Sequence, residues 1–124
     1  MYEELDLPPP TDGVYRVHYS YEVKAKPPIM GTGLAAMGDI CVILVVGHYK
    51  CWYATQTRWI RVGNRTHATH PHFHRLQLVL TSEGPQWRSE EEIVAHVRLD
   101  GCLVGFTQLL QVRSRIHTNI NVSH

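Results

Sequence analysis

The sequence lacks the patterns that mark several large classes of protein. Its longest apolar run, Ile40 to Gly47, is far shorter than the ~20 residues that a helix needs to cross a bilayer. It has only three cysteines, Cys41, Cys51 and Cys102, and none belongs to a Cys-x-x-Cys pair. Because the number of cysteines is small and odd, the sequence excludes a disulfide scaffold and a zinc site of four thiolates. It favours reduced, buried thiols.

Catalytic signatures are missing as well. The chain contains no phosphate-binding P-loop and no Gly-x-Ser-x-Gly motif. Gly31 to Ala36 matches the glycine spacing of a dinucleotide fingerprint, but Pro27 and Pro28 separate it from the preceding strand pattern, so chance explains the match. The sequence therefore favours a binding protein over an enzyme and implies no cofactor.

The composition is that of one globular domain. Apolar residues make up 44% and charged residues 19% of 124 residues, which excludes a wholly disordered chain. Residues 1–12 are acidic and proline-rich without periodicity and predict a flexible tail, and residues 13–124 predict a single β-rich domain. Because the first residues resemble no signal peptide, we expect a cytoplasmic, intracellular protein.

Period-two alternation is the main structural signal. It runs from Tyr15 to Ala25 and recurs from Arg75 to Thr81, while residues 51–62 form a mixed aromatic and basic strand pattern. The continuous apolar residues 40–46 are typical of a strand that is covered on both faces. Residues 110–122 alternate again. The patterns predict a mostly antiparallel sheet of about five strands.

One helix is predicted near residues 90–99. Ser89 and Glu92 have the spacing of a capping box, and Glu90 and Glu91 suit the positive end of a helix dipole. Apolar residues follow on one stripe, and a glycine at position 101 ends the pattern. Together with the strands, this helix predicts the α+β fold class.

Charge is segregated along the chain. No acidic residue lies between Asp39 and Glu83, and arginines, histidines and aromatic residues fill that interval. Such a mixture suits a polyanion, because cations neutralise phosphates while exposed rings stack on unpaired bases or lie at a lipid interface. We therefore predict contacts to RNA or to an anionic membrane, the alternative being that the aromatic rings are core. The predicted contact residues are Lys50, Trp52, Arg58, Trp59, Arg61, Arg65 and Arg75.

Two further features predict partners. Tyr2 and Leu5 form a Tyr-x-x-Leu element, and the prolines Pro8, Pro9 and Pro10 could offer a polyproline ligand to an adaptor domain. The alternating residues 110–122 would leave a strand edge that must be covered, so we expect a homo-oligomer.

This order of elements resembles the matrix proteins of rhabdoviruses, in which a proline-rich tail with tyrosine precedes a β-rich domain with few helices. The resemblance implies a viral, self-associating assembly protein that acts in the host cell cytoplasm. Tyr2, Leu5 and Pro8 to Pro10 would be its tail element, and the segment from Lys50 to Arg75 would be its contact surface.

A histidine cluster supports an alternative function. In an extended segment His70, His72 and His74 would share one face and could bind a divalent transition metal. A glycine upstream of His70-Pro71-His72, Gln77 at the position of a carboxylate and a closing glycine resemble the metal motif of the cupin family. The resemblance implies a metal-dependent β-barrel enzyme, with His117 as a further ligand. A solvated histidine face without metal is the other interpretation.

Overall fold

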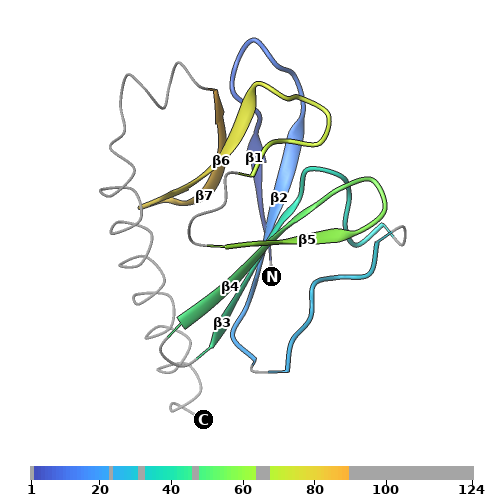
Figure 1. Ribbon diagram of the computed structural model, residues 1–124, viewed down its shortest axis with the longest axis vertical. Coiled ribbons are helices and arrows are strands. Elements are labelled where there is room, and N and C mark those ends of the chain that lie inside the picture. The colour runs from blue at the N-terminus through green and yellow to red at the C-terminus, as the bar shows by residue number, and fades with distance from the viewer. Residues whose placement is uncertain (1, 23, 31–32, 46–47, 64–67, 90–124) are drawn as a thin grey trace.

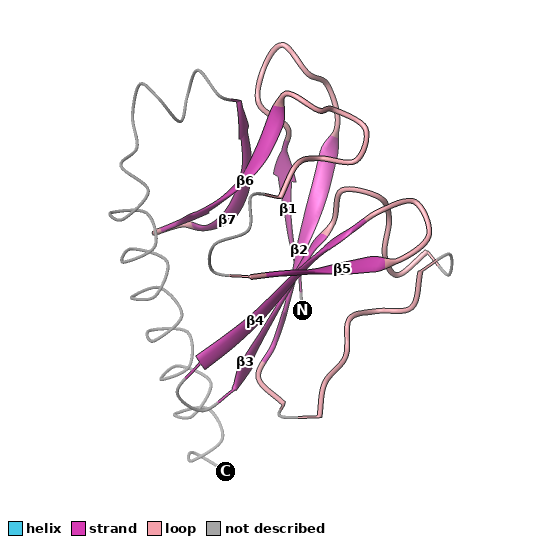
Figure 2. Cartoon of the chain, viewed as in Figure 1, coloured by secondary structure: helices cyan, strands magenta, loops and turns pink. Residues whose placement is uncertain are grey.

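The computed structural model describes residues 2–22, 24–30, 33–45, 48–63 and 68–89. Within these ranges the chain forms seven strands and no helix (Figure 2). The strands are β1 (Tyr2–Asp6), β2 (Val14–Ser20), β3 (Ile40–Val45), β4 (His48–Ala54), β5 (Trp59–Val62), β6 (Leu76–Thr81) and β7 (Gly84–Ser89).

The predicted α+β class with a single sheet is wrong for the part of the chain that the structure describes. Seven strands are divided between a five-stranded sheet, in the order β1-β2-β3-β4-β5, and a separate β6–β7 hairpin (Figure 1). The helix predicted near residues 90–99 lies outside the described residues, so nothing in the structure supports it. The fold that can be described is all-β.

The larger sheet is antiparallel except at its centre. β2 and β3 run parallel, and a parallel pair needs a crossover from one end of the sheet to the other. Residues 24–30 and 33–39 belong to this connection and are called the crossover below. Trp59 of β5 fixes it to the sheet, because its indole N–H donates a hydrogen bond to the Pro28 carbonyl at 2.7 Å.

The core lies between the two sheets. Alternate residues of the larger sheet, such as Val17, Ile40 and Val42, are fully buried and belong to one apolar cluster with Leu76 and Trp87 of the hairpin. This side is called the inner face. The other side, the outer face, carries the polar positions of β2, β4 and β5, and over β3 it is also closed to solvent. Burial on both faces explains why residues 40–45 are continuously apolar.

Four segments differ from their sequence-based predictions. Tyr2–Asp6 forms β1 and pairs with β2, although the first twelve residues have the composition of a tail. The single strand predicted over residues 51–62 is a hairpin, β4 and β5, whose turn closes where Thr55 N–H donates to the Arg58 carbonyl at 2.8 Å. The strand predicted over residues 75–81 ends at Thr81 as expected, but the strand β7 that follows it through a tight turn was not predicted. The strand predicted from Tyr15 to Ala25 ends at Ser20.

Candidate functional site

Four of the predicted polyanion-binding residues lie together on the outer face. Trp52 of β4 and Arg61 of β5 are direct cross-strand partners, and Ala54 pairs with Trp59 one step along. Cross-strand partners point to the same side of a sheet, as do residues two apart along one strand. The outer face therefore carries one set, called the basic aromatic row: Lys50, Trp52, Trp59 and Arg61.

The centre of this row is a stacked pair. The guanidinium carbon of Arg61 lies 5.1 Å from the centroid of the Trp52 ring, which is cation–π geometry. Arg61 is exposed and Trp52 is half-buried, so the charge is at the surface with the ring beside it. β4 and β5 contain no acidic residue that could neutralise the arginine.

The remaining predicted cations are placed differently. Arg58 is exposed in the turn between β4 and β5, at the end of the row. Arg75 is also exposed, but it lies in the turn directly before β6, away from β4 and β5 in the fold. Arg65 lies outside the described residues. Among the residues described, the predicted contact residues that share one face thus cover less of the chain than the sequence segment from Lys50 to Arg75.

A buried ionic network, which the sequence analysis missed, lies beside the row on the outer face. Asp39 is only 2% exposed, yet its carboxylate accepts four hydrogen bonds. Arg16 donates from its backbone N–H at 3.0 Å and from Nε at 3.2 Å, and the Ala36 N–H donates at 3.1 Å. His18 Nε2 lies 3.0 Å from the same carboxylate. The only sequence signal was that Arg16 and His18 occupy polar positions of an otherwise apolar strand.

The network keeps Asp39 ionised. Burial alone would raise the pKa of this carboxyl group, but hydrogen bonds from His18, Arg16 and Ala36, with the charge of Arg16, outweigh burial and lower the pKa. The carboxylate therefore ties the crossover to β2. The ring of His18 also meets that of Trp59 edge-on, with centroids 6.1 Å apart. This contact links the network to the basic aromatic row.

The predicted docking element at the N-terminus is arranged as a strand and a turn. Tyr2 and Leu5 fall on opposite faces of β1: the Tyr2 ring lies 5.5 Å from the Arg16 guanidinium, whereas Leu5 packs against the core. After β1, the Thr11 N–H donates to the Pro8 carbonyl at 3.1 Å, which closes a turn through Pro9 and Pro10. In the structure the prolines therefore form a turn, and docking of an adaptor domain stays a prediction.

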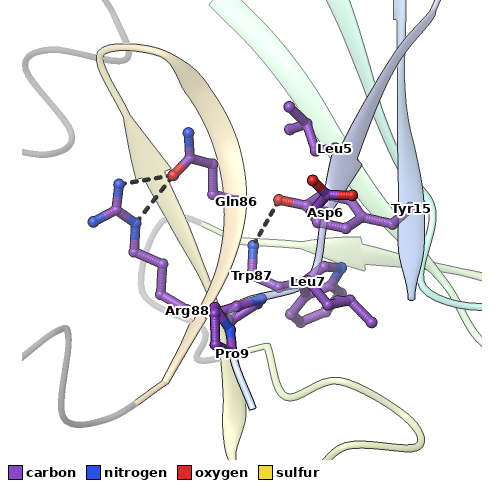
Figure 3. Close-up of a pocket in the computed structure, with 9 residues that line it drawn as sticks. Leu5, Asp6, Leu7, Pro9, Tyr15, Gln86, Trp87 and Arg88 are labelled. Carbon is purple, nitrogen blue, oxygen red and sulfur yellow. Dashed lines mark hydrogen bonds between the residues drawn. The ribbon is translucent and has the colours of Figure 1, made fainter. Parts of the chain in front are cut away.

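A pocket of about 350 Å³ opens where the end of β1 meets β7 (Figure 3). Its floor is Tyr15, whose hydroxyl accepts a hydrogen bond from the Trp87 N–H at 3.3 Å. Arg88 and Gln86 line one side, and both guanidinium contacts of Arg88, at 3.0 and 2.8 Å, go to the side-chain carbonyl of Gln86. Asp6 lies across the pocket. The bonds within the pairs Trp87–Tyr15 and Arg88–Gln86 are thus made between lining residues and do not converge on a common point.

Within the described residues, the three histidines of the cluster are not arranged as metal ligands. Residues 70–75 turn rather than extend, so His70, His72 and His74 do not share a face. His70 is buried, and its Nδ1 accepts hydrogen bonds from the backbone N–H groups of His72 and Phe73, both at 3.1 Å. Among the described residues, no group of three histidine, cysteine or acidic side chains is placed to hold a metal ion. His117 lies outside the described part of the chain.

His70 instead has a structural role. Its ring packs edge-on against Trp87, with centroids 4.8 Å apart, and lies against Gly38. Burial, together with the nearby His72 and His74, lowers the pKa of His70 from 6.5 to about 4. The neutral ring closes the loop before β6 and packs that loop against the start of β3.

Comparison with protein-family models, with curated proteins and with solved structures finds no match to this chain. No helix in the described ranges is long and apolar enough to cross a membrane. The resemblances to rhabdovirus matrix proteins and to cupins stay predictions from the sequence, and any proposal about function has to rest on the geometry of the chain itself.

Proposed function

We propose that this protein binds single-stranded RNA through the basic aromatic row. The observation that carries the proposal is the cross-strand pair of Arg61 and Trp52, in which an exposed guanidinium lies over a half-buried indole. Lys50 lies on the same face, two residues from Trp52, which places it about 7 Å away along the strand.

The pair combines the two interactions that RNA requires. A guanidinium neutralises a phosphate and can form two hydrogen bonds to it, while an aromatic ring stacks on an unpaired base in a way that tolerates any sequence. Arg58 in the adjoining turn and Lys50 extend the positive charge along the row in both directions. The row therefore supplies a stacking platform with cations on either side.

RNA fits this surface better than an anionic membrane does. Interfacial tryptophans anchor a protein by entering the headgroup layer, whereas Trp52 and Trp59 are half-buried in the sheet. The indole N–H of Trp59 is moreover held by the Pro28 carbonyl. Half-buried rings at the surface of a sheet can stack on bases without having to enter a lipid layer.

Paired charge reversals test the proposal. Arg61→Glu and Arg75→Glu change the net charge equally, but only Arg61 belongs to the row. We expect Arg61→Glu to weaken binding of a fluorescent single-stranded RNA about tenfold or more and to lower the salt slope by about 0.7, the loss of one phosphate contact. Arg75→Glu should retain most of the affinity. Fluorescence anisotropy over a salt series measures both.

The aromatic contribution is tested separately with Trp52→Leu, which removes the stacking ring but retains an apolar side chain. Stacking contributes about 1–3 kcal/mol for each base, so the affinity should fall at least about fivefold with little change in salt slope. Equal losses in Arg61→Glu and Arg75→Glu would contradict a localised site. Binding to vesicles of anionic lipid, without binding to RNA, would overturn the proposal.

A further inference from the structure

The five-stranded sheet ends in two edge strands of opposite charge. β1 and β5 are its outermost strands, and in the described part of the chain no other strand pairs with their outer edges. β1 carries the exposed acids Glu4 and Asp6, whereas β5 carries the exposed Arg61 and is preceded by Arg58. We propose that β1 of one copy pairs with β5 of another, which extends the sheet from molecule to molecule.

Strand direction allows this pairing without turning either copy over. β1 is antiparallel to β2, β2 is parallel to β3, and β3, β4 and β5 alternate in direction. β1 and β5 therefore run in opposite directions. A second copy displaced along the sheet places its β1 antiparallel to β5, with the outer faces of the two copies continuous.

The backbone groups needed for the ladder point outward. In an antiparallel pair, residues whose backbones bond to the neighbouring strand alternate with residues whose backbones face away. Leu7 N–H donates to the Gly13 carbonyl and Thr55 N–H to the Arg58 carbonyl, which fixes this alternation on both edges. The outward-facing backbones are then those of Tyr2, Glu4 and Asp6 on β1 and of Trp59 and Arg61 on β5.

The side chains fit the same register. Glu4 pairs with Arg16, and Arg61 pairs with Trp52, so the acids of β1 and the arginine of β5 all lie on the outer face. When Glu4 of one copy is opposite Arg61 of the next, Asp6 is opposite Trp59. Opposite charges that face each other across an antiparallel pair are stabilising, and like charges are destabilising.

The same charges exclude the competing contacts. Two β1 edges would bring acid against acid, and two β5 edges would bring arginine against arginine, so both symmetric dimers are disfavoured. Only the contact between unlike edges remains. Because such a contact is head-to-tail, it produces a ring when the rotation closes and an open chain when it does not.

Two edge variants test the proposal. The first, Glu4→Arg with Asp6→Arg, makes both edges basic; the second, Arg58→Glu with Arg61→Glu, makes both edges acidic. Sedimentation velocity of nucleic-acid-free protein, over a wide range of concentration, measures assembly. We expect the wild type to assemble at low salt and to dissociate as salt is raised. Each variant alone should assemble about tenfold more weakly or worse.

An equimolar mixture of the two variants provides the decisive result. Mixing restores an acidic edge opposite a basic edge at every contact, so assembly should return. A wild type that stays monomeric throughout, or a mixture of folded variants that stays monomeric, would overturn the proposal. Should circular dichroism show that a variant is unfolded, the neutral substitutions Glu4→Gln and Asp6→Asn replace it. These must weaken assembly and reduce its salt dependence, and unchanged assembly would equally refute the pairing.

The assembly experiment is independent of RNA binding. Glu4 and Asp6 lie outside the basic aromatic row, so the first variant should bind RNA at least as well as the wild type while failing to assemble. Loss of assembly in the first variant supports edge pairing whether or not the wild type binds RNA. RNA binding by a wild type that stays monomeric would support the RNA site and refute edge pairing.

Discussion

The buried His70 makes the stability of this protein depend on pH in a predictable way. Its Nδ1 accepts two backbone hydrogen bonds, so protonation of that nitrogen would break both. The pKa is lowered from 6.5 to about 4 in the folded protein. Below pH 6.5, His70 becomes protonated in the unfolded chain but stays neutral in the folded protein. The free energy of unfolding therefore decreases as the pH is lowered, until the folded ring is also protonated near pH 4.

The magnitude follows from the same pKa values. Since a tenfold change in proton affinity corresponds to ~1.4 kcal/mol, His70 accounts for a loss of about 3 kcal/mol in the free energy of unfolding between pH 6.5 and 4. Replacing His70 with Asn leaves an oxygen that can accept the same backbone hydrogen bonds and does not titrate. The variant is expected to be less stable at pH 7, but to lose about 3 kcal/mol less than the wild type on acidification.

Urea unfolding of both proteins across this pH range measures the difference and cancels the contributions of all other titrating groups. His74→Asn is the matched control, because His74 is exposed, its Nε2 lies 3.3 Å from the Pro71 carbonyl, and its charge is a lesser cause of the lowered pKa of His70 than burial is. It should retain nearly the full pH dependence. Parallel curves for the wild type and His70→Asn would refute the assigned role of His70.

Three other expectations follow from buried groups. Gly38→Ala should cost about 2 kcal/mol or more in urea unfolding, because φ is +90° there and a Cβ would lie 2.7 Å from His70 Nε2; an unchanged midpoint would contradict this contact. Asp39→Asn should cost about 3 kcal/mol at neutral pH. In the wild type, stability contributed by Asp39 is lost as the pH falls below 3.8 and through the lowered pKa of its carboxyl group, and Asp39→Asn should not show this loss. The same decrease of stability in acid for both proteins would count against the network. Cys41 and Cys51, whose pKa values burial raises to about 12, should resist iodoacetamide in the folded protein and react in urea, as residue-resolved mass spectrometry would show.

Those strands that bury a regular pattern of side chains could be predicted from the sequence. The apolar run from Ile40 coincides with β3, and the alternation after Arg75 coincides with β6. β1 could not be predicted, because its acidic residues satisfy no local pattern and the strand exists through pairing with β2. The β4–β5 hairpin could not be predicted either, because its turn contains no glycine or proline. Its two strands therefore have the pattern of one continuous strand.

The candidate site was predictable in composition but not in shape. Charge segregation identified Lys50, Trp52, Trp59 and Arg61, yet only the hairpin register shows that they share a face. The interpretation of the histidine cluster assumed an extended backbone, and the turn at residues 70–75 removes that premise. The network around Asp39 joins residues that are far apart in sequence, and no spacing rule relates them.

The bond between Trp87 and Tyr15 has a consequence for the order of folding. These residues are 72 positions apart, and the indole N–H of Trp87 also reaches back 49 positions to the Gly38 carbonyl at 2.8 Å. The hairpins β3–β4, β4–β5 and β6–β7 need only local chain closure, whereas the core of the described residues includes the fully buried Trp87 from β7. During synthesis, the inner face of the larger sheet therefore stays without Trp87 until residue 87 has left the ribosome. We expect this non-local contact to form more slowly than the local hairpins.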